Sequence, residues 1–440
     1  MREGWDKVEL GRICSIKGGK RLPKGHELIE IETDHKYIRA RDIKNGKINF
    51  DQPTYISEST FNLISRYIVN KGDVIITIVG ANIGDTAMVT GEFDGANLTE
   101  NAVKLVSDKD KADSLFLKYA LVPNYMKYYF QIVASGAAQD KLGIYKIKKI
   151  KINLPPLKTQ RKIASILSAY DDLIENNLKR IKLLEEQAQL TYEEWFVRFK
   201  FPGHETTKFD EETGLPEGFN NEKFENLFTI NNGYAFKSND YRNDGVKILR
   251  TKDYSQTKWI SIDQPIYLSK KKAENYSRYF VKEYDLMLIM VGASIGNYGI
   301  VLPKDLGVLQ NQNQWAIRSK NKEYNFFKIL MMEDLIKSLL NKKTGAARDF
   351  FRASFLKEMV VVVPDNSIIK QFNDLIEPIY SAINTLFSQN QHLKEARDIL
   401  LPRLMSGMID VEKLEVGSLK YVVNDSLGMV AEDIEKYKRA

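Results

Sequence analysis

Hydrogen-bonding side chains occupy two short glycine turns, one in each half of the chain. Gly80-Ala-Asn-Ile-Gly84 contains Asn82, and Gly292-Ala-Ser-Ile-Gly296 contains Ser294. Amide, hydroxyl and guanidinium groups are those with which proteins read base edges in the grooves of DNA. The same groups also cap turns and strand ends, so a structural role is the commoner outcome for any single one of them.

Catalytic chemistry has little support in the residue pattern. Asn153-Leu-Pro-Pro156 is similar to the Asn-Pro-Pro-aromatic motif of adenine methyltransferases, but Leu154 and Leu157 stand where that motif has a proline and an aromatic ring. The glycine turns match neither a phosphate loop nor a dinucleotide fingerprint. Cys14 is the only cysteine and the four histidines are scattered. We therefore expect no metal site, no cofactor and no intrinsic enzyme activity.

The elements that carry the glycine turns are duplicated along the whole chain. Asp51-Gln-Pro53 returns as Asp263-Gln-Pro265 at the same offset as the turns, and Ser135-Gly-Ala-Ala-Gln-Asp140 is matched at a slightly smaller offset by Thr344-Gly-Ala-Ala-Arg-Asp349. Each copy combines a β-rich domain with a long helix. We expect a first domain at 1–155, a first helix at 156–200, a linker at 201–217, a second domain at 218–365, a second helix at 366–410 and a tail at 411–440 that has no counterpart in the first copy.

Both predicted helices show a heptad seam, in which apolar residues alternate four and three apart. The polar residues Asn177 and Gln389 interrupt the two seams at positions that share the offset of the glycine turns, which favours pairing of the helices with each other over two unrelated core helices. The seam positions are Ile163, Leu167, Tyr170, Ile174, Asn177, Ile181 and Leu184 in the first helix, and Leu375, Ile379, Leu386, Gln389, Leu393 and Leu400 in the second.

Composition describes an ordinary globular protein with a mild positive charge. The 440 residues have a formal net charge of +7, and 43% of them are hydrophobic. Such an excess fits nucleic-acid binding without requiring it. The apolar runs are too short to span a membrane and the start of the chain has no apolar signal core, so we expect a cytoplasmic protein.

Taken in order, these motifs resemble those of the specificity subunit of a Type I restriction-modification enzyme, over about residues 1–415. The resemblance is carried by the domain–helix–domain–helix repeat, the two glycine turns, the two Ser/Thr-Gly-Ala-Ala loops, Leu154-Pro-Pro-Leu157, Glu194-Trp-Phe-Val-Arg198 and Leu400-Leu-Pro-Arg-Leu404. It implies an α+β tandem repeat in which two target-recognition domains each read one half of a split double-stranded DNA site.

The resemblance further implies that the helices pair as an antiparallel coiled coil, which spaces the two domains and docks two modification (methyltransferase) subunits. The chain would be non-catalytic, and would confer specificity on the adenine methyltransferase and the restriction and translocase activities of other subunits. A coiled-coil protein-binding scaffold without DNA specificity is the alternative. Steep weakening of DNA binding by salt would favour the DNA reader.

We expect basic and amide side chains of both domains to contact DNA, and Trp195 and Phe196 to contact a partner subunit. Plugging the domain–helix junction is an equal alternative for that aromatic pair. The predicted DNA contacts are Lys20, Arg21, Arg39, Arg41, Asn82, Gln139, Lys141 and Lys146 in the first domain, and Arg250, Lys252, Ser294, Gln312, Gln314, Arg348 and Arg352 in the second.

Overall fold

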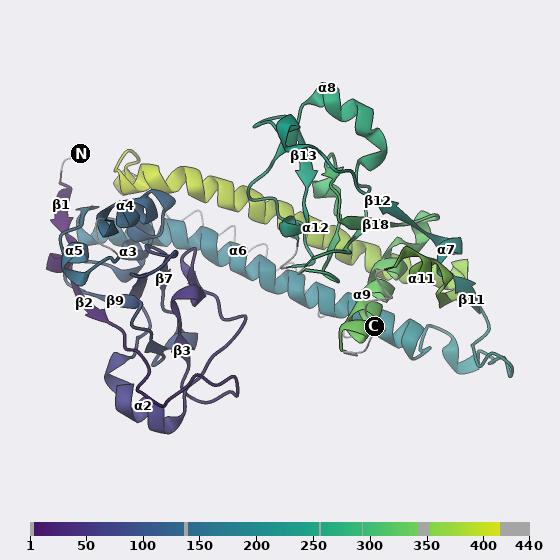
Figure 1. Cartoon of the computed structure of the whole chain (residues 1–440), viewed down its shortest axis with the longest axis horizontal. Coiled ribbons are helices and arrows are strands. Elements are labelled where there is room, and N and C mark those ends of the chain that lie inside the picture. Colours follow the sequence, from purple (N-terminus) through teal and green to yellow (C-terminus); the bar gives the residue numbers. More distant parts are fainter. Residues whose placement is uncertain (1–3, 136–139, 255–256, 293, 342–351, 414–440) are drawn as a thin grey trace. The chain divides into compact units, whose positions relative to one another are not determined.

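The computed structural model describes residues 4–135, 140–254, 257–292, 294–341 and 352–413. The chain divides into two compact units. Unit 1 comprises Met1–Ile174 with His392–Ala440, and unit 2 comprises Glu175–Gln391. Each unit therefore contains one globular domain and a stretch of both long helices (Figure 1).

The domain of unit 1 is built on a four-stranded antiparallel sheet. Its strands follow the order β2 (Cys14–Gly18), β9 (Ala102–Ser107), β6 (Val74–Thr77) and β7 (Thr86–Met88). Strand β6 is buried along its whole length, because Val74 and Ile76 pack into one hydrophobic cluster and Ile75 into another on the opposite face. Smaller pairs are β1 (Asp6–Glu9) with β10 (Lys151–Leu154), β3 (Tyr37–Ile38) with β8 (Asn97–Leu98), and β4 (Ile43–Lys44) with β5 (Lys47–Ile48). The helices are α1 (Leu10–Ile13), α2 (Glu58–Ile64), α3 (Ser114–Leu121), α4 (Asn124–Ala134) and α5 (Ile144–Lys148).

The domain of unit 2 repeats this topology. Its four-stranded sheet follows the order β12 (Phe228–Asn232), β18 (Gln314–Ser319), β15 (Leu286–Ile289) and β16 (Tyr298–Ile300). The other sheets join β11 (Phe219–Lys223) to β19 (Val360–Pro364), and β13 (Val246–Leu249) to β14 (Tyr267–Leu268) and β17 (Leu309–Gln310). Its helices are α7 (Phe224–Leu227), α8 (Lys270–Ala273), α9 (Asn325–Asn341) and α11 (Ala353–Glu358). The matching strand orders confirm the predicted tandem α+β repeat.

The long helices α6 (Leu157–Tyr192) and α12 (Asn366–Met405) pair in antiparallel directions. Within unit 1, Arg397 Nη1 donates to Asp171 Oδ1 at 2.7 Å. Within unit 2, Asn177 Nδ2 donates to Asn390 Oδ1 at 2.9 Å, and this amide pair is buried. Residue numbers rise along α6 while those of the partners fall along α12, which confirms the expected antiparallel coiled coil.

The predicted seam is correct for α6 and partly wrong for α12. Leu375 is 45% exposed and Gln389 is exposed, whereas their neighbours Ile376 and Asn390 are buried. The buried face of α12 follows Ile369, Phe372, Ile376, Ile379, Ile383, Leu386 and Asn390, so the prediction was displaced by one residue at alternate steps. The other predicted positions are buried or half-buried: Ile163, Leu167, Tyr170, Ile174, Asn177, Ile181 and Leu184 in α6, and Ile379, Leu386, Leu393 and Leu400 in α12.

The carboxyl end of each long helix completes the core of the domain that it does not follow in sequence. The end of α12 places Leu404 and Met405 in the core of unit 1 with Ile163 and Leu167. The end of α6 continues as a π-helical turn, Glu193–Val197, whose Trp195 and Phe196 lie in the core of unit 2. Within the described ranges, none of the helices combines the length and the apolar character that a membrane crossing requires.

Candidate nucleic-acid interface

The two glycine turns adopt backbone conformations that side chains other than glycine rarely reach. Gly80 and Gly84 have φ angles of +89° and +88°, and Gly292 and Gly296 have +95° and +86°. A Cβ atom on Gly84 would lie only 3.0 Å from the carbonyl oxygen of Lys127 in α4. The predicted tight turns are therefore confirmed.

Each glycine turn lies beside another predicted DNA contact. In the first domain Asn82 is exposed, and Val79 forms a bridge with the exposed Lys141. In the second domain Ser294 is half-buried, and Met290 N donates to Asn313 O at 3.3 Å, beside the exposed Gln312. The structure thus gathers a polar group from the turn and one from a distant loop in each domain.

Arg39 and Arg250 hold turns inside the protein, and their contact with DNA stays a prediction. The Arg39 Nη2 atom lies 2.9 Å from Asp42 Oδ1 and also donates to the carbonyl oxygen of Gln52. The Arg250 guanidinium lies 3.4 Å from Asp253 and donates to the carbonyl oxygen of Gln264. Their side chains are only 16% and 19% exposed, and their Nε and Nη2 donors are engaged within the protein.

Gln314 is structural, against the prediction, and Lys146 also bonds within the protein while its contact with DNA stays a prediction. The Lys146 ammonium donates to the carbonyl oxygen of Val133 at 2.7 Å at the end of α4, where a cation meets the negative end of the helix dipole. The Gln314 side chain is completely buried and donates to the carbonyl oxygen of Leu249 at 2.7 Å. It also accepts from the Tyr254 hydroxyl, and burial holds the pKa of Tyr254 well above its usual range.

Several other predicted DNA contacts lie on the surface. Arg41 is 59% exposed and Lys252, at the matching place in the second domain, is exposed as well. Lys20 is exposed with its ammonium 5.6 Å from the ring centroid of Tyr67. Arg21 is 79% exposed but pairs with Glu100 at 2.8 Å, while Arg352 is exposed at the start of α11. Gln139 and Arg348 lie outside the described residues.

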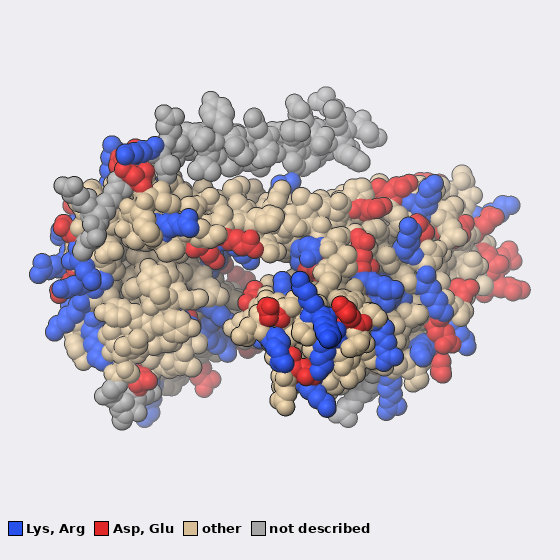
Figure 2. All heavy atoms as spheres, turned by 90° about the horizontal axis from the view of Figure 1, so that it is seen from above, with Lys and Arg blue, Asp and Glu red and all other residues tan. Residues whose placement is uncertain are grey.

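A run of lysines in α8 was missed by the sequence reasoning. Lys270, Lys271 and Lys272 occupy the positions where the first copy has Glu58, Ser59 and Thr60 at the start of α2. Lys272 pairs with Asp240 at 2.5 Å, whereas Lys270 and Lys271 are exposed. Figure 2 shows basic side chains gathered over the lobe of unit 2 that contains α8. The sequence contains a sign of this basic cluster, because the aligned positions change from one acidic residue in the first copy to three lysines in the second.

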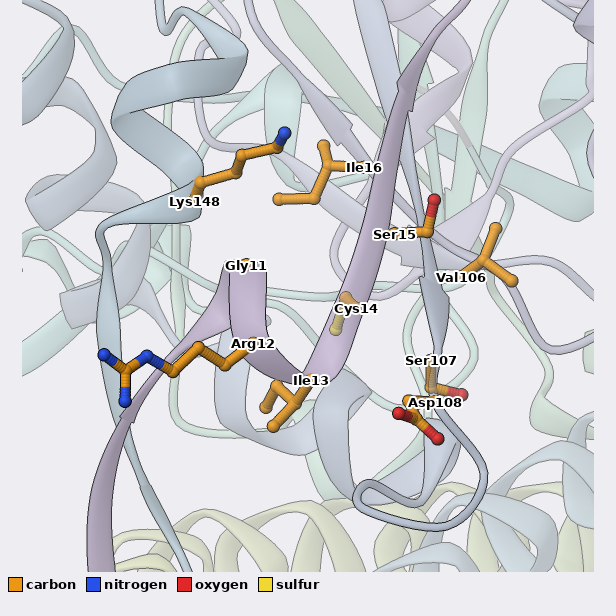
Figure 3. Close-up of a pocket in the computed structure, with 10 residues that line it drawn as sticks. All are labelled: Gly11, Arg12, Ile13, Cys14, Ser15, Ile16, Val106, Ser107, Asp108 and Lys148. Atoms are coloured by element: carbon orange, nitrogen blue, oxygen red, sulfur yellow. The ribbon is translucent and has the colours of Figure 1, made fainter.

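A pocket of unit 1 contains the single cysteine and offers no reactive thiol. It lies along β2 and β9, with Arg12 and Lys148 on one side and Ser107 and Asp108 on the other (Figure 3). Burial, together with the nearby Asp108 charge, raises the pKa of Cys14 to about 12, so its reactive thiolate form is scarce at neutral pH. Among the described residues, no group of three His, Cys, Asp or Glu side chains is placed to hold a metal ion.

Trp195 and Phe196 are each 7% exposed, which corrects their assignment to a partner surface. The Phe196 ring lies 4.7 Å from the ring of Phe372 and 5.1 Å from that of Phe327, measured between centroids. The two side chains therefore fill the junction between the helices and the second domain.

Comparison with known proteins shows a family that covers most of the chain. Residues 2–186 and 216–395 match the type I restriction modification DNA specificity domain. The chain is 24% identical over 414 residues to the type I restriction enzyme MjaIX specificity subunit of Methanocaldococcus jannaschii, covering 93% of this chain and 94% of the relative. It is also 24% identical over 422 residues to the MjaVIII specificity subunit of the same organism, covering 94% of each.

A solved structure has the same fold. The S subunit of a type I restriction-modification system from M. genitalium is 16% identical, with a TM-score of 0.55, and the match covers 91% of this chain and 96% of that one. Both the family match and this likeness extend across the two domains and the helices. The chain thus belongs to the type I restriction-modification DNA specificity family, as a specificity subunit with two DNA-recognition domains.

Proposed function

We propose that this subunit reads a bipartite site in double-stranded DNA, with one domain for each half of the site. The observation that carries the proposal is a buried frame that recurs while the exposed groups on it change. The Arg39–Asp42 pair returns as Arg250–Asp253, yet the turn residue changes from Asn82 to Ser294. Two copies of one frame with different hydrogen-bonding groups suit two related readers of different base sequences.

We further propose that the outward face of α6 docks a modification subunit, in place of Trp195 and Phe196. Leu183, Leu190 and Val197 are 64%, 57% and 52% exposed. They follow one another at intervals of seven residues, so they form one apolar stripe along the helix and its terminal turn. Apolar stripes of this kind mark contact surfaces for other proteins.

In this proposal the chain contributes sequence recognition and spacing, and other subunits contribute chemistry. Two modification subunits would methylate adenine, and restriction and translocase subunits would join in the full complex. The coiled coil would hold the two readers at a fixed separation, which requires a gap of unspecified base pairs between the half-sites. Since its ligand is DNA, we place the protein in the cytoplasm.

The test is the methylated sequence of host DNA, mapped with and without this chain beside its modification subunit. We expect a split motif that is methylated only when the chain is present. Replacing residues 1–150 by the same region of a relative should change one half of the motif and leave the other half and the gap intact. If both halves change, or methylation proceeds without the chain, the assignment of one domain to each half-site fails.

The salt dependence of DNA binding distinguishes the DNA reader from the protein-scaffold alternative. A DNA reader loses affinity steeply as salt rises, because its phosphate contacts release counterions. A protein scaffold without DNA specificity would give no such slope with a duplex that carries the mapped motif.

A further inference from the structure

Helix α4 of unit 1 is apolar on two opposite faces. Met126, Phe130 and Ala134 are buried in the core. Tyr125, Tyr128, Tyr129 and Ile132 are 55%, 64%, 43% and 71% exposed. Their spacing of three, four and seven residues places these four on one face, which we call the tyrosine stripe. Exposed apolar stripes of this size mark an interaction surface.

The sequence around the tyrosine stripe is strongly basic. Between Asn124 and Lys151 the chain has six lysines and a single acidic residue, Asp140. Lys148 and Lys149 are exposed on and just after α5, where Tyr145 is 66% exposed. Helix α5 is fixed to the end of α4 by the bond from the Lys146 ammonium to the carbonyl oxygen of Val133. Aromatic rings near exposed lysines such as Lys148 and Lys149 suit a polyanion better than an apolar protein surface.

Helix α4, which carries the stripe, is also bonded to the candidate interface. Gln131 Nε2 in α4 donates to the carbonyl oxygen of Ile83 at 3.3 Å, within the glycine turn. Lys127 Nζ pairs with Asp85, just after the turn, at 2.5 Å. Together with the close approach of Gly84 to Lys127, these bonds fix α4 against the turn that exposes Asn82. The glycine turn therefore lies against the Lys127 and Gln131 side of α4, and the helical spacing puts the stripe on the adjacent side.

The second copy lacks the stripe. With the offset that aligns the two Ser/Thr-Gly-Ala-Ala loops, the tyrosine stripe corresponds to Asp334, Lys337, Ser338 and Asn341. A surface for a ligand that both copies bind in the same way would be present in both. The stripe belongs instead to what distinguishes the first domain from the second.

We propose that the tyrosine stripe of α4, with the neighbouring lysines of α5, contacts duplex DNA beside the glycine turn of the first domain. Tyrosine hydroxyls would hydrogen-bond to phosphate oxygens, and the rings with Ile132 would lie against sugars and thymine methyl groups. The proposal rests on the proposed DNA-reading function and adds a surface that is specific to one half-site.

The first test compares two pairs of exposed residues in the full chain. Tyr128→Ser with Ile132→Ser should weaken binding to a duplex that carries the mapped motif by about tenfold, without changing the salt slope. Leu306→Ser with Ile399→Ser, which removes side chains that are 47% and 54% exposed and lie in neither proposed binding surface, should leave DNA affinity unchanged. Lys148→Gln with Lys149→Gln should instead reduce the salt slope, by about 0.9 for each phosphate that is no longer neutralised.

Replacing Tyr128 by the photoreactive residue benzoylphenylalanine tests the same surface. The replacement keeps an aromatic ring at an exposed position, so the fold should be preserved. In the complex with modification subunits and duplex, it should crosslink to DNA, while the same group at Leu183 should crosslink to protein. Crosslinks from position 128 to protein only, or unchanged affinity of the serine variant, would overturn the inference. If the unaltered chain itself fails to bind the duplex, the proposed function fails as well, so the two failures are distinguishable.

Discussion

The two domains share their buried polar pairs but differ in the aromatic and basic groups at Lys20 and Tyr234. In the first domain the Lys20 ammonium lies over the Tyr67 ring, whereas in the second Tyr234 takes that place, 5.2 Å from the Tyr279 ring. Both domains also keep a buried aspartate at the start of an inner strand of the four-stranded sheet. Asp73 pairs with Lys104 at 3.5 Å, and Asp285 pairs with Arg318 at 2.6 Å. Removing one partner of a buried polar pair is strongly destabilising. Both copies have therefore kept such a pair after the duplication, while exposed positions have diverged.

The largest expected effect comes from breaking the exchange of helix ends. Trp195→Ala should cost about 3–5 kcal/mol and Leu404→Ala about 2–5 kcal/mol, because each leaves a cavity in a packed core. Hydrogen exchange should show loosening of unit 2 by the first change and of unit 1 by the second. Val197→Ala, at a 52% exposed position, should stay within about 0.5 kcal/mol. Loosening of the same unit by both changes would contradict the exchanged ends.

The second effect concerns two carboxylates that join a domain to the helices. Asp171 accepts from Lys118, Tyr119 and Arg397 at 2.7–2.8 Å. Glu185 accepts from the Trp259 indole, and its nearest cation, Lys258, lies 4.0 Å away and also contacts Glu333 at 3.1 Å. Asp171→Asn should therefore cost about 3 kcal/mol. Glu185→Gln should stay within about 1 kcal/mol, because glutamine can still accept from the indole.

The carboxylates of Asp171 and Glu185 should also affect stability in opposite ways as the pH falls. Burial alone would raise the pKa of Asp171, but Lys118 and the other donors hold it below its usual value, so its stabilisation is complete above pH about 3.9 and is lost below. Burial raises the pKa of Glu185 in spite of Lys258, so its charge opposes folding until the pH falls through that raised value. The stability difference between wild type and Glu185→Gln should shrink on mild acidification, whereas that for Asp171→Asn should hold until pH about 4.

The sequence predicted the frame well because duplication marks it. The strand run at Val74, the glycine turns and the pairing of the helices all leave periodic or repeated signals. The same logic does not single out DNA contacts, because recurring residues such as Arg39 and Arg250 also form a recurring structural pair. Gln314 was misread for a similar reason, since an amide gives no sign of burial until its partners at Leu249 and Tyr254 are known.

The α12 seam shows a second limit of sequence reasoning. Transferring the α6 seam by the offset of the repeat selected Leu375 and Gln389, whereas packing selects Ile376 and Asn390. In an antiparallel pair the facing residues are not the repeat-equivalent ones, so the offset between the copies does not give the contacts. The expected polar step was present, but one residue further along the helix.

The buried amide pair gives an effect of intermediate size. Asn177→Leu alone should cost about 1–3 kcal/mol, because it strands the Asn390 amide in an apolar seam. Adding Asn390→Leu should recover most of that loss, and a double-mutant cycle by denaturant unfolding measures the coupling. The double variant should also pair its helices less uniquely, which disulfide trapping across the seam would detect. Additive losses would show that the amides do not act together.

The smallest expected effect concerns the exposed basic residue within the Arg39–Asp42 or Arg250–Asp253 turn in each domain. Arg41 and Lys252 lie two residues after Arg39 and Arg250, and both are exposed. If the two domains present this step to DNA alike, Arg41→Gln and Lys252→Gln should each lower the salt slope by about 0.9, the value for one phosphate. Neither should alter the methylated motif, because phosphates carry no sequence information. Lys182→Gln, at a 77% exposed position on α6, should leave the slope unchanged. A lower slope for only one of the two variants would mean that the domains share a frame but face the duplex with different edges.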